Sequence, residues 1–145
     1  MGYTEFDDFT YAYSDLDGET ARTTIAANKA IERGISVVAS AGNHGNEPWY
    51  YISSPADGFN VIAVGSVDRN ERVSAFSSRG PTADGRIKPD CMALGEQVWI
   101  VDVSGKNTYR FANGTSFAAP AVSGSVALML EINPFMTPTA VVDSL

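Results

Sequence analysis

The chain has 145 residues, of which 44% are hydrophobic and 19% charged, and its net charge is −7. This composition is ordinary for one soluble globular domain and argues against a disordered chain. The negative charge disfavours nucleic acid and anionic membranes as partners, because both bind basic surfaces. No apolar run approaches the roughly 20 residues that a membrane helix needs. Cys91 is the sole cysteine, which excludes an internal disulfide, and we expect it to be a small buried apolar side chain.

The first half of the chain predicts a parallel α/β unit. Up to about Asp17 there is no hydrophobic period, which indicates an irregular loop. Small and apolar residues then recur at helical spacing over 20–33, and Gly34 is placed to end that helix. Two β-branched runs, at 35–41 and 61–67, follow the helix. We expect both to be short strands, the first of them buried on both faces of a parallel sheet.

The second half adds a hairpin and two helices. Lys88 precedes Pro89, so residues 88–90 are expected to be extended. The runs at 98–103 and 108–111 flank a loop and predict a β-hairpin. The segment 116–132 is apolar almost all round, so we expect a helix buried in a core. Thr137-Pro138 then has the residues of a helix cap and first turn.

Ser116 is the most distinctive candidate for a catalytic residue. The sequence Gly114-Thr115-Ser116 places this serine in the first turn of a predicted helix, after a glycine-containing turn. A helix N-terminus has unpaired N–H groups and the positive end of a dipole, which favour a nearby anion. A tetrahedral oxyanion formed at Ser116 would benefit from that placement. The alternative is an ordinary serine near a helix cap.

Asn43 is the second candidate. The segment Ser40-Ala41-Gly42-Asn43 ends a predicted parallel strand, which is where open α/β sheets place functional groups. The side-chain amide of Asn43 can donate a hydrogen bond to an oxyanion. The alternative is a turn asparagine in the left-handed conformation.

Taken in order, four segments resemble the catalytic domain of subtilases, the subtilisin-like serine proteases of peptidase family S8. They are Val37-Val38-Ala39-Ser40-Ala41-Gly42-Asn43, Val61 to Asp68 with Ser74-Ala75-Phe76-Ser77-Ser78-Arg79-Gly80-Pro81, Lys88-Pro89-Asp90, and Gly114-Thr115-Ser116-Phe117-Ala118-Ala119-Pro120. The resemblance covers essentially the whole chain in the order and spacing of the family. It implies a three-layer α/β fold with a mostly parallel sheet.

The same resemblance implies a serine endopeptidase acting on peptides or proteins. Ser116 would be the nucleophile that forms the acyl-enzyme, and Asn43 the oxyanion-hole side chain. The remaining residues expected to contact substrate are Gly2, Ala41, Gly42, His44 and Thr115. No cofactor is implied; calcium is common in the family, but no aspartate-rich loop here matches a calcium site. By analogy, the full-length protein is expected to be secreted or attached to the cell envelope.

Two members of the subtilase triad have no match in this chain. In the family an aspartate and a histidine precede the oxyanion asparagine, yet no histidine precedes Asn43. His44, the sole histidine, directly follows Asn43 and lacks the Gly-Thr-His context; its position implies the rim of the specificity pocket. Residues 15–18, Asp-Leu-Asp-Gly, are better interpreted as a turn before a helix than as the family's Asp-Thr/Ser-Gly strand end.

We therefore expect residues 1–145 to form a single partial domain, the C-terminal half of a catalytic domain whose N-terminal half is absent. Without a base the serine is a poor nucleophile, so the chain alone is expected to be inactive. Exposed apolar edges are expected to make it self-associate. The alternative is a subtilase-like module that binds peptides without cleaving them. A nucleotide-binding domain is disfavoured because no glycine-rich phosphate loop follows a strand.

Overall fold

The computed structural model describes residue 4 and residues 6–145, so Gly2 lies outside the described residues. The helical elements in chain order are η1 (Tyr13–Asp15), α1 (Arg22–Ile31), α2 (Thr115–Ile132) and α3 (Pro138–Val142). The strands are β1 (Val38–Ser40), β2 (Ile62–Val67), β3 (Cys91–Leu94), β4 (Val98–Asp102) and β5 (Thr108–Ala112).

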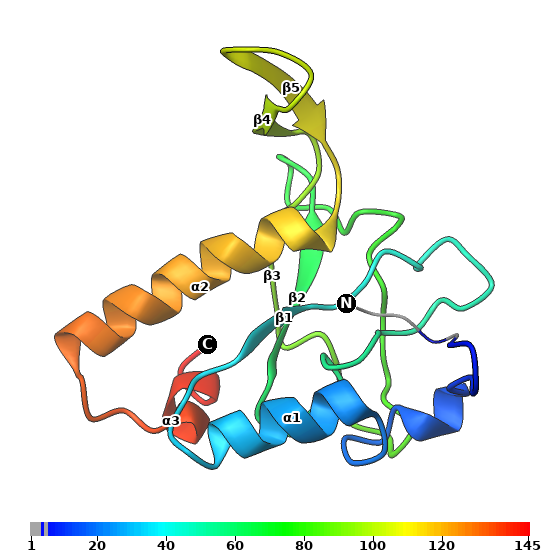
Figure 1. The fold of residues 1–145 in the computed structure, drawn as a ribbon. Helices are drawn as coiled ribbons and strands as arrows, with labels where there is room; N and C mark the ends of the chain where they lie inside the picture. The colour runs from blue at the N-terminus through cyan, green and yellow to red at the C-terminus, as the bar shows by residue number, and fades with distance from the viewer. Residues whose placement is uncertain (1–3, 5) are drawn as a thin grey trace.

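A three-stranded parallel sheet forms the middle of three layers, with strand order β1-β2-β3. Helix α2 crosses one face of this sheet and α1 lies on the other (Figure 1). The largest buried cluster joins the central strand to the C-terminal helices; its members are Ile62, Val64, Ala118, Val122, Val126 and Val141. The predicted three-layer fold with a parallel sheet is confirmed, and β2 is its most buried strand.

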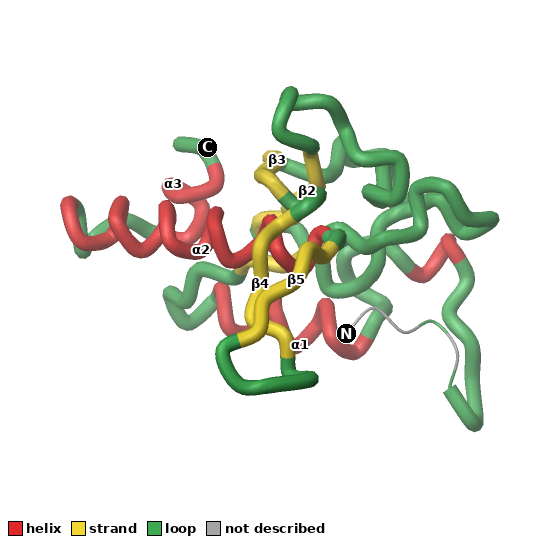
Figure 2. The backbone as a smooth tube through the Cα atoms, turned by 90° about the horizontal axis from the view of Figure 1, so that it is seen from above, coloured by secondary structure: helices red, strands yellow, loops and turns green. Residues whose placement is uncertain are grey.

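The predicted hairpin is also confirmed, as the antiparallel pair β4-β5. It stands away from the sheet in Figure 1, and Figure 2 looks down on it in front of the three layers. Trp99 lies opposite Phe111 across the hairpin, with ring centroids 4.6 Å apart, and it stacks on Tyr109. These rings stay more than half exposed, so they pack mainly against one another.

Several local predictions hold because they depend on nearby residues alone. The turn before α1 forms as expected, since the Asp17 carboxylate accepts hydrogen bonds from the backbone N–H groups of Glu19 and Thr20. Gly34 follows α1 with a φ of 83°, a conformation that glycine adopts at little cost. The Thr137 hydroxyl caps α3 by accepting from the Ala140 N–H at 3.2 Å.

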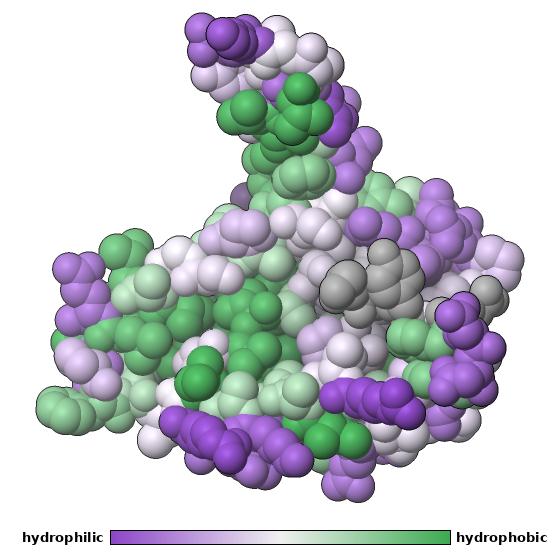
Figure 3. All heavy atoms as spheres, viewed as in Figure 1, coloured by the Kyte–Doolittle hydropathy of each residue, from purple (hydrophilic) through white to green (hydrophobic). Residues whose placement is uncertain are grey.

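Two burial predictions are wrong because strand β1 and helix α2 are each covered on one side only. The segment predicted as a fully buried strand over 35–41 is regular over Val38–Ser40 alone, and these residues are half-buried because β1 pairs with β2 on one side of the described sheet. Helix α2 is buried along one face, while Leu128 and Ile132 are 62% and 87% exposed. Figure 3 shows apolar side chains gathered on the surface between α2 and α1.

The expectation that no segment is long and apolar enough to cross a membrane is wrong for α2. It has the length and hydropathy to cross a membrane by composition alone. In the fold its buried face packs on all three strands of the parallel sheet.

Strand β3 was not predicted, since the sequence indicated only that 88–90 is extended. A buried lysine explains how it is aligned. The Lys88 Nζ donates to the Val61 carbonyl at 2.7 Å and to the Asp90 carboxylate at 2.7 Å. The same Asp90 oxygen accepts from the Ala63 N–H at 2.7 Å. Hydrogen bonds of Lys88 and Asp90 thus join the beginnings of β2 and β3. Cys91, the first residue of β3, is half-buried and packs against the core.

We predict that Lys88→Met lowers the free energy of unfolding by about 3 kcal/mol, because it leaves the Asp90 carboxylate without its cation and the Val61 carbonyl without the Lys88 hydrogen bond. Chemical denaturation measures the loss. Lys106→Met, in the exposed loop of the hairpin, is the matched control and should change stability by less than about 0.5 kcal/mol. Equal effects of the two substitutions would show that the buried pair does not align the strands.

Candidate active site

The chain reaches the candidate site at the carboxyl end of β1. Ala41 is fully buried, donates its N–H to the Val64 carbonyl at 2.9 Å, and accepts from the Ser53 N–H at 2.9 Å. Gly42 follows with a φ of 115°, and a Cβ there would lie 2.8 Å from both the Ser53 and the Ser78 hydroxyl oxygens. A glycine is required at this turn for both reasons. The turn directs Asn43 toward the N-terminus of α2.

Asn43 is held by Thr115, the first residue of α2. Its Oδ1 accepts hydrogen bonds from the Thr115 N–H and from the Thr115 hydroxyl, both at 2.9 Å. The same hydroxyl accepts from the Gly42 N–H at 3.2 Å. Because a backbone N–H can only donate, the amide atom that faces it must be the carbonyl oxygen. The Asn43 NH₂ group is therefore turned away from Thr115 and remains available as a donor.

Ser116 is exposed at the second position of α2. The first N–H groups of a helix have no partner within the helix. In α2 the Thr115 N–H donates to Asn43, and the Ser116 N–H is the next of these groups. The Asn43 nitrogen lies 3.5 Å from the place that a Cβ on Gly114 would occupy, so the amide donor points to the turn before Ser116. The hydroxyl, the amide and the helix N-terminus meet in one region.

One cavity of about 580 Å³ brings the candidate residues together. Its lining includes Gly42, Asn43, His44, Thr115 and Ser116, all of which the sequence singled out. Ala41, also expected to contact substrate, is fully buried and is not among the residues that line this cavity. The catalytic and substrate-binding roles of these residues remain predictions.

His44 lies at the cavity and faces Glu47. Its Nδ1 is 2.7 Å from the Glu47 Oε2, and both side chains are partly exposed. Its backbone N–H donates to the Ser78 hydroxyl at 3.0 Å. The hydrogen bonds of the described residues include none between the His44 ring and Ser116, and His44 and Glu47 both line the cavity.

Sequence reasoning missed several polar residues of this cavity, among them Glu47 and Ser53. Ser53 is 4% exposed, and its hydroxyl has no hydrogen-bond partner among the described residues. A buried hydroxyl without a partner is uncommon, and this one lines the cavity that also contains Ser116. No sequence pattern marks it, because its position depends on the turn at Gly42 that it packs against.

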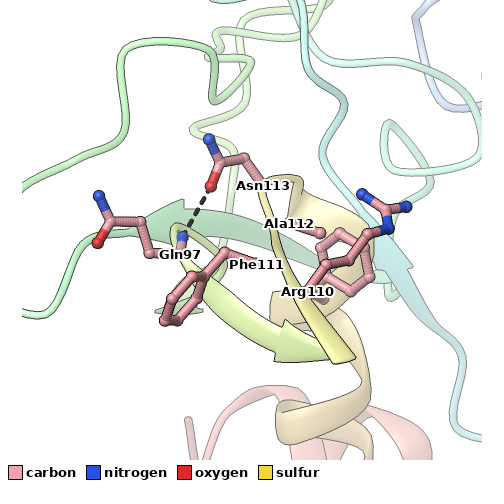
Figure 4. A pocket seen from close by; sticks show the side chains of 6 residues that line it. Gln97, Arg110, Phe111, Ala112 and Asn113 are labelled. Carbon is pink, nitrogen blue, oxygen red and sulfur yellow. Dashed lines mark hydrogen bonds between the residues drawn. The ribbon is translucent and has the colours of Figure 1, made fainter. Parts of the chain in front are cut away.

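A second hollow, of about 560 Å³, lies at the base of the hairpin (Figure 4). The Gln97 N–H donates to the Asn113 Oδ1 at 2.7 Å and joins the beginning of β4 to the end of β5. Asn113 therefore has a structural contact just before Gly114 and Ser116. Phe117 lines the hollow from α2, so this space adjoins the helix turn that carries Ser116.

Metal binding is not indicated by the described part of the chain. Within residue 4 and residues 6–145, no three side chains among His, Cys, Asp and Glu come close enough to hold an ion. Carboxylate clusters are what calcium requires. The expectation of no cofactor stays a prediction.

Comparison with known proteins agrees with this geometry. The model of the Subtilase family matches residues 8–145. The chain belongs to the subtilase family. It is 40% identical over 129 residues to Subtilisin DY of Bacillus licheniformis, covering 87% of this chain and 44% of the relative. It is 36% identical over 137 residues to the Serine protease AprX of Bacillus subtilis, covering 80% and 30%.

The fold comparison gives the same result. A crystal structure of a cold-adapted subtilisin-like serine proteinase superposes with a TM-score of 0.68 and 30% sequence identity, covering 82% of this chain and 40% of that one. The resemblance seen in the sequence is thus confirmed as membership of a serine protease family. This subtilase chain spans less than half the length of the two curated relatives.

We predict that Thr115→Val destabilises the chain by about 1–2 kcal/mol, because it removes the hydroxyl between Gly42 and Asn43 and leaves the partly buried Gly42 N–H without its acceptor. It also releases one of the two donors that fix the Asn43 amide. Thermal unfolding measures the first effect, and the side-chain amide signals of Asn43 in ¹H–¹⁵N spectra measure the second.

Thr115→Ser keeps the hydroxyl and should preserve both readouts. Thr139→Val, at an exposed position of α3, controls for the loss of a hydroxyl elsewhere. Unchanged Asn43 amide signals in Thr115→Val would show that the threonine hydroxyl does not orient the amide.

Proposed function

We propose that this chain supplies the nucleophile and the oxyanion donors of a serine endopeptidase site. The observation that carries the proposal is the Thr115–Asn43 contact, which fixes the amide carbonyl and leaves the NH₂ group free beside Ser116. Preorganised donors of this kind stabilise an oxyanion because they need no reorganisation during the reaction.

The proposed reaction starts with attack of the Ser116 Oγ on the carbonyl carbon of a peptide bond. A base takes the hydroxyl proton, and the carbonyl oxygen becomes an oxyanion that accepts from the Asn43 amide and the Ser116 N–H. Collapse breaks the C–N bond, the amine leaves with the proton, and an ester remains on Ser116. Water then hydrolyses this ester by the same steps and regenerates the hydroxyl.

The base is the part that the chain does not supply in this proposal. His44 is the sole histidine, and it lacks the sequence context of the family's catalytic histidine. Loss of the catalytic histidine costs about 2 × 10⁶ in turnover, a factor known for a subtilisin itself and carried over here. We therefore propose that residues 1–145 alone do not hydrolyse peptides at a useful rate. We also propose that the protein acts on peptides or proteins outside the cell or at its envelope.

The proposal predicts that the isolated chain is not labelled at Ser116 by a fluorophosphonate probe. Joined to an upstream subtilase segment that carries the aspartate and the histidine, the chain should be labelled and should hydrolyse peptide substrates. Ser116→Ala should abolish both activities. Asn43→Ala should lower kcat by about 10²–10³, again the factor known for a subtilisin.

Asn107→Ala, in the exposed hairpin loop, is the matched control and should leave kcat unchanged. Labelling of the isolated chain would contradict its predicted inactivity. A joined protein that folds and binds peptides, but is never labelled, would contradict catalysis and support the alternative of a non-catalytic peptide-binding module.

Self-association is the second part of the proposal. The apolar side chains of Leu128 and Ile132 are one turn apart on α2 and largely exposed, and exposed apolar patches drive association. We expect sedimentation to show oligomers of the isolated chain. Replacing both residues with Gln should weaken association at least tenfold, whereas Val103→Gln at the exposed hairpin loop should not. A monomer at high concentration would refute this expectation.

A further inference from the structure

The wall of the candidate site that contains Ser53 is an irregular segment, yet it is buried. Residues 52–58 form no helix or strand, and Ile52, Ala56 and Asp57 are completely inaccessible. Buried irregular backbone is stable when its polar groups find partners. The Ile52 N–H donates to the Arg79 carbonyl at 3.0 Å, and the Ser53 N–H to the Ala41 carbonyl at 2.9 Å.

Asp57 connects this segment to two other parts of the chain. One carboxylate oxygen accepts from the Thr24 hydroxyl of α1, and the other accepts from the Gly18 N–H at 3.1 Å. The Asn28 amide, also on α1, donates to the Gly18 carbonyl at 2.7 Å. A single carboxyl group thus fastens the cavity wall to α1 and to the turn before it.

The charged groups around Asp57 compensate the charge of its ionised carboxylate only in part. From α1 it meets the uncharged Thr24. Asp17, in the adjoining turn, is bonded within that turn. Arg86 acts on Asp57 only through space, because its Nε pairs with Asp84 at 2.7 Å and its two Nη atoms have no acceptor among the described residues. Its guanidinium carbon lies 4.4 Å from the centre of the Phe59 ring instead.

We propose that Asp57 is a pH-sensitive latch that positions the cavity wall at residues 53–55, and that the wall loosens when this carboxyl group ionises. A neutral carboxyl satisfies both neighbours: its carbonyl oxygen accepts from the Gly18 N–H, and its O–H donates to the Thr24 hydroxyl, which can also accept. The ionised form is buried without a bonded cation. The importance of the latch for substrate rests on the proposed function; the latch itself does not.

The direction of the pH effect follows from burial. Burial raises the pKa of Asp57, and the hydrogen bonds from Thr24 and Gly18 and the charge of Arg86 offset this only in part. When the wall opens, the carboxyl meets water and its pKa returns to about 3.9. Stability of the closed wall is therefore full below that value and is lost as pH rises through the raised, closed-state pKa. The opening equilibrium grows by up to tenfold per pH unit in this window and then levels off.

Native-state hydrogen exchange of the intact chain tests the latch. Protection factors of the Ile52 and Ser53 amides, corrected for intrinsic exchange, should fall as pH rises from about 4. The Ala63 amide, on the central strand and bonded to Asp90, is the internal control for global opening and should keep its protection. Constant protection at the wall, or an equal fall at Ala63, would overturn the proposal.

Asp57→Asn removes the charge and keeps both contacts, because its amide accepts from Gly18 and donates to Thr24. We expect the wall to become independent of pH and to keep the protection of the acid form. Asp84→Asn, which changes the partner of Arg86 but not Asp57, should retain the pH dependence. If the dependence persists in Asp57→Asn, Asp57 is not the latch. Peptide binding, measured separately at both ends of the pH range, reports on the proposed function, so the two ideas can fail independently.

Discussion

The candidate site depends on one contact across the fold, between the Asn43 side chain and Thr115. These residues are 72 positions apart in sequence, at the end of β1 and at the beginning of α2. The contact uses the first free N–H of the helix, a buried hydroxyl and the turn at Gly42. Its effect is to set which end of the Asn43 amide is presented beside Ser116. An oxyanion donor acts through such a fixed direction more than through its chemical type.

The packing of the layers brings the end of β1 and the beginning of α2 together, so that this contact can form. Packing of Val64 and Ile62 on β2 against Val122 and Val126 on α2 fixes the helix relative to the sheet. Parallel pairing of Val38 with Ile62 then fixes where β1 ends. Apolar packing is not directional, so it places elements without orienting side chains. The final orientation requires the hydrogen bonds of Thr115.

Polar groups have the same function at two other places. Lys88 aligns β2 with β3, and Asp57 holds an irregular wall against α1. Each lies where the backbone is buried but not regular, so that carbonyls and N–H groups need partners from side chains. The charge of Asp57 makes its contact sensitive to pH, whereas Lys88 is paired with Asp90.

The sequence was sufficient for the elements with local signals and for the motifs. The helix after Asp17, the strand at 61–67, the hairpin and the cap at Thr137 all depend on neighbouring residues. The resemblance to subtilases located Ser116 and Asn43. The burial of α2 was overestimated, because hydrophobic periodicity shows which faces are apolar and not what covers them. Strand β3 and the partners of Asp57 were missed because residues 27 to 39 positions apart define them. The Ser53 hydroxyl was missed because the turn at Gly42 places it.

The account is tested most directly by a crystal structure of this chain joined to an upstream subtilase segment and captured as a tetrahedral adduct of a peptide boronic acid on Ser116. We expect one boronate oxygen within about 3 Å of both the Asn43 nitrogen and the Ser116 nitrogen, with the Asn43 Oδ1 still on Thr115. An adduct whose oxygens point away from Asn43, or an amide rotated off Thr115, would contradict the central claim that this contact prepares the oxyanion site.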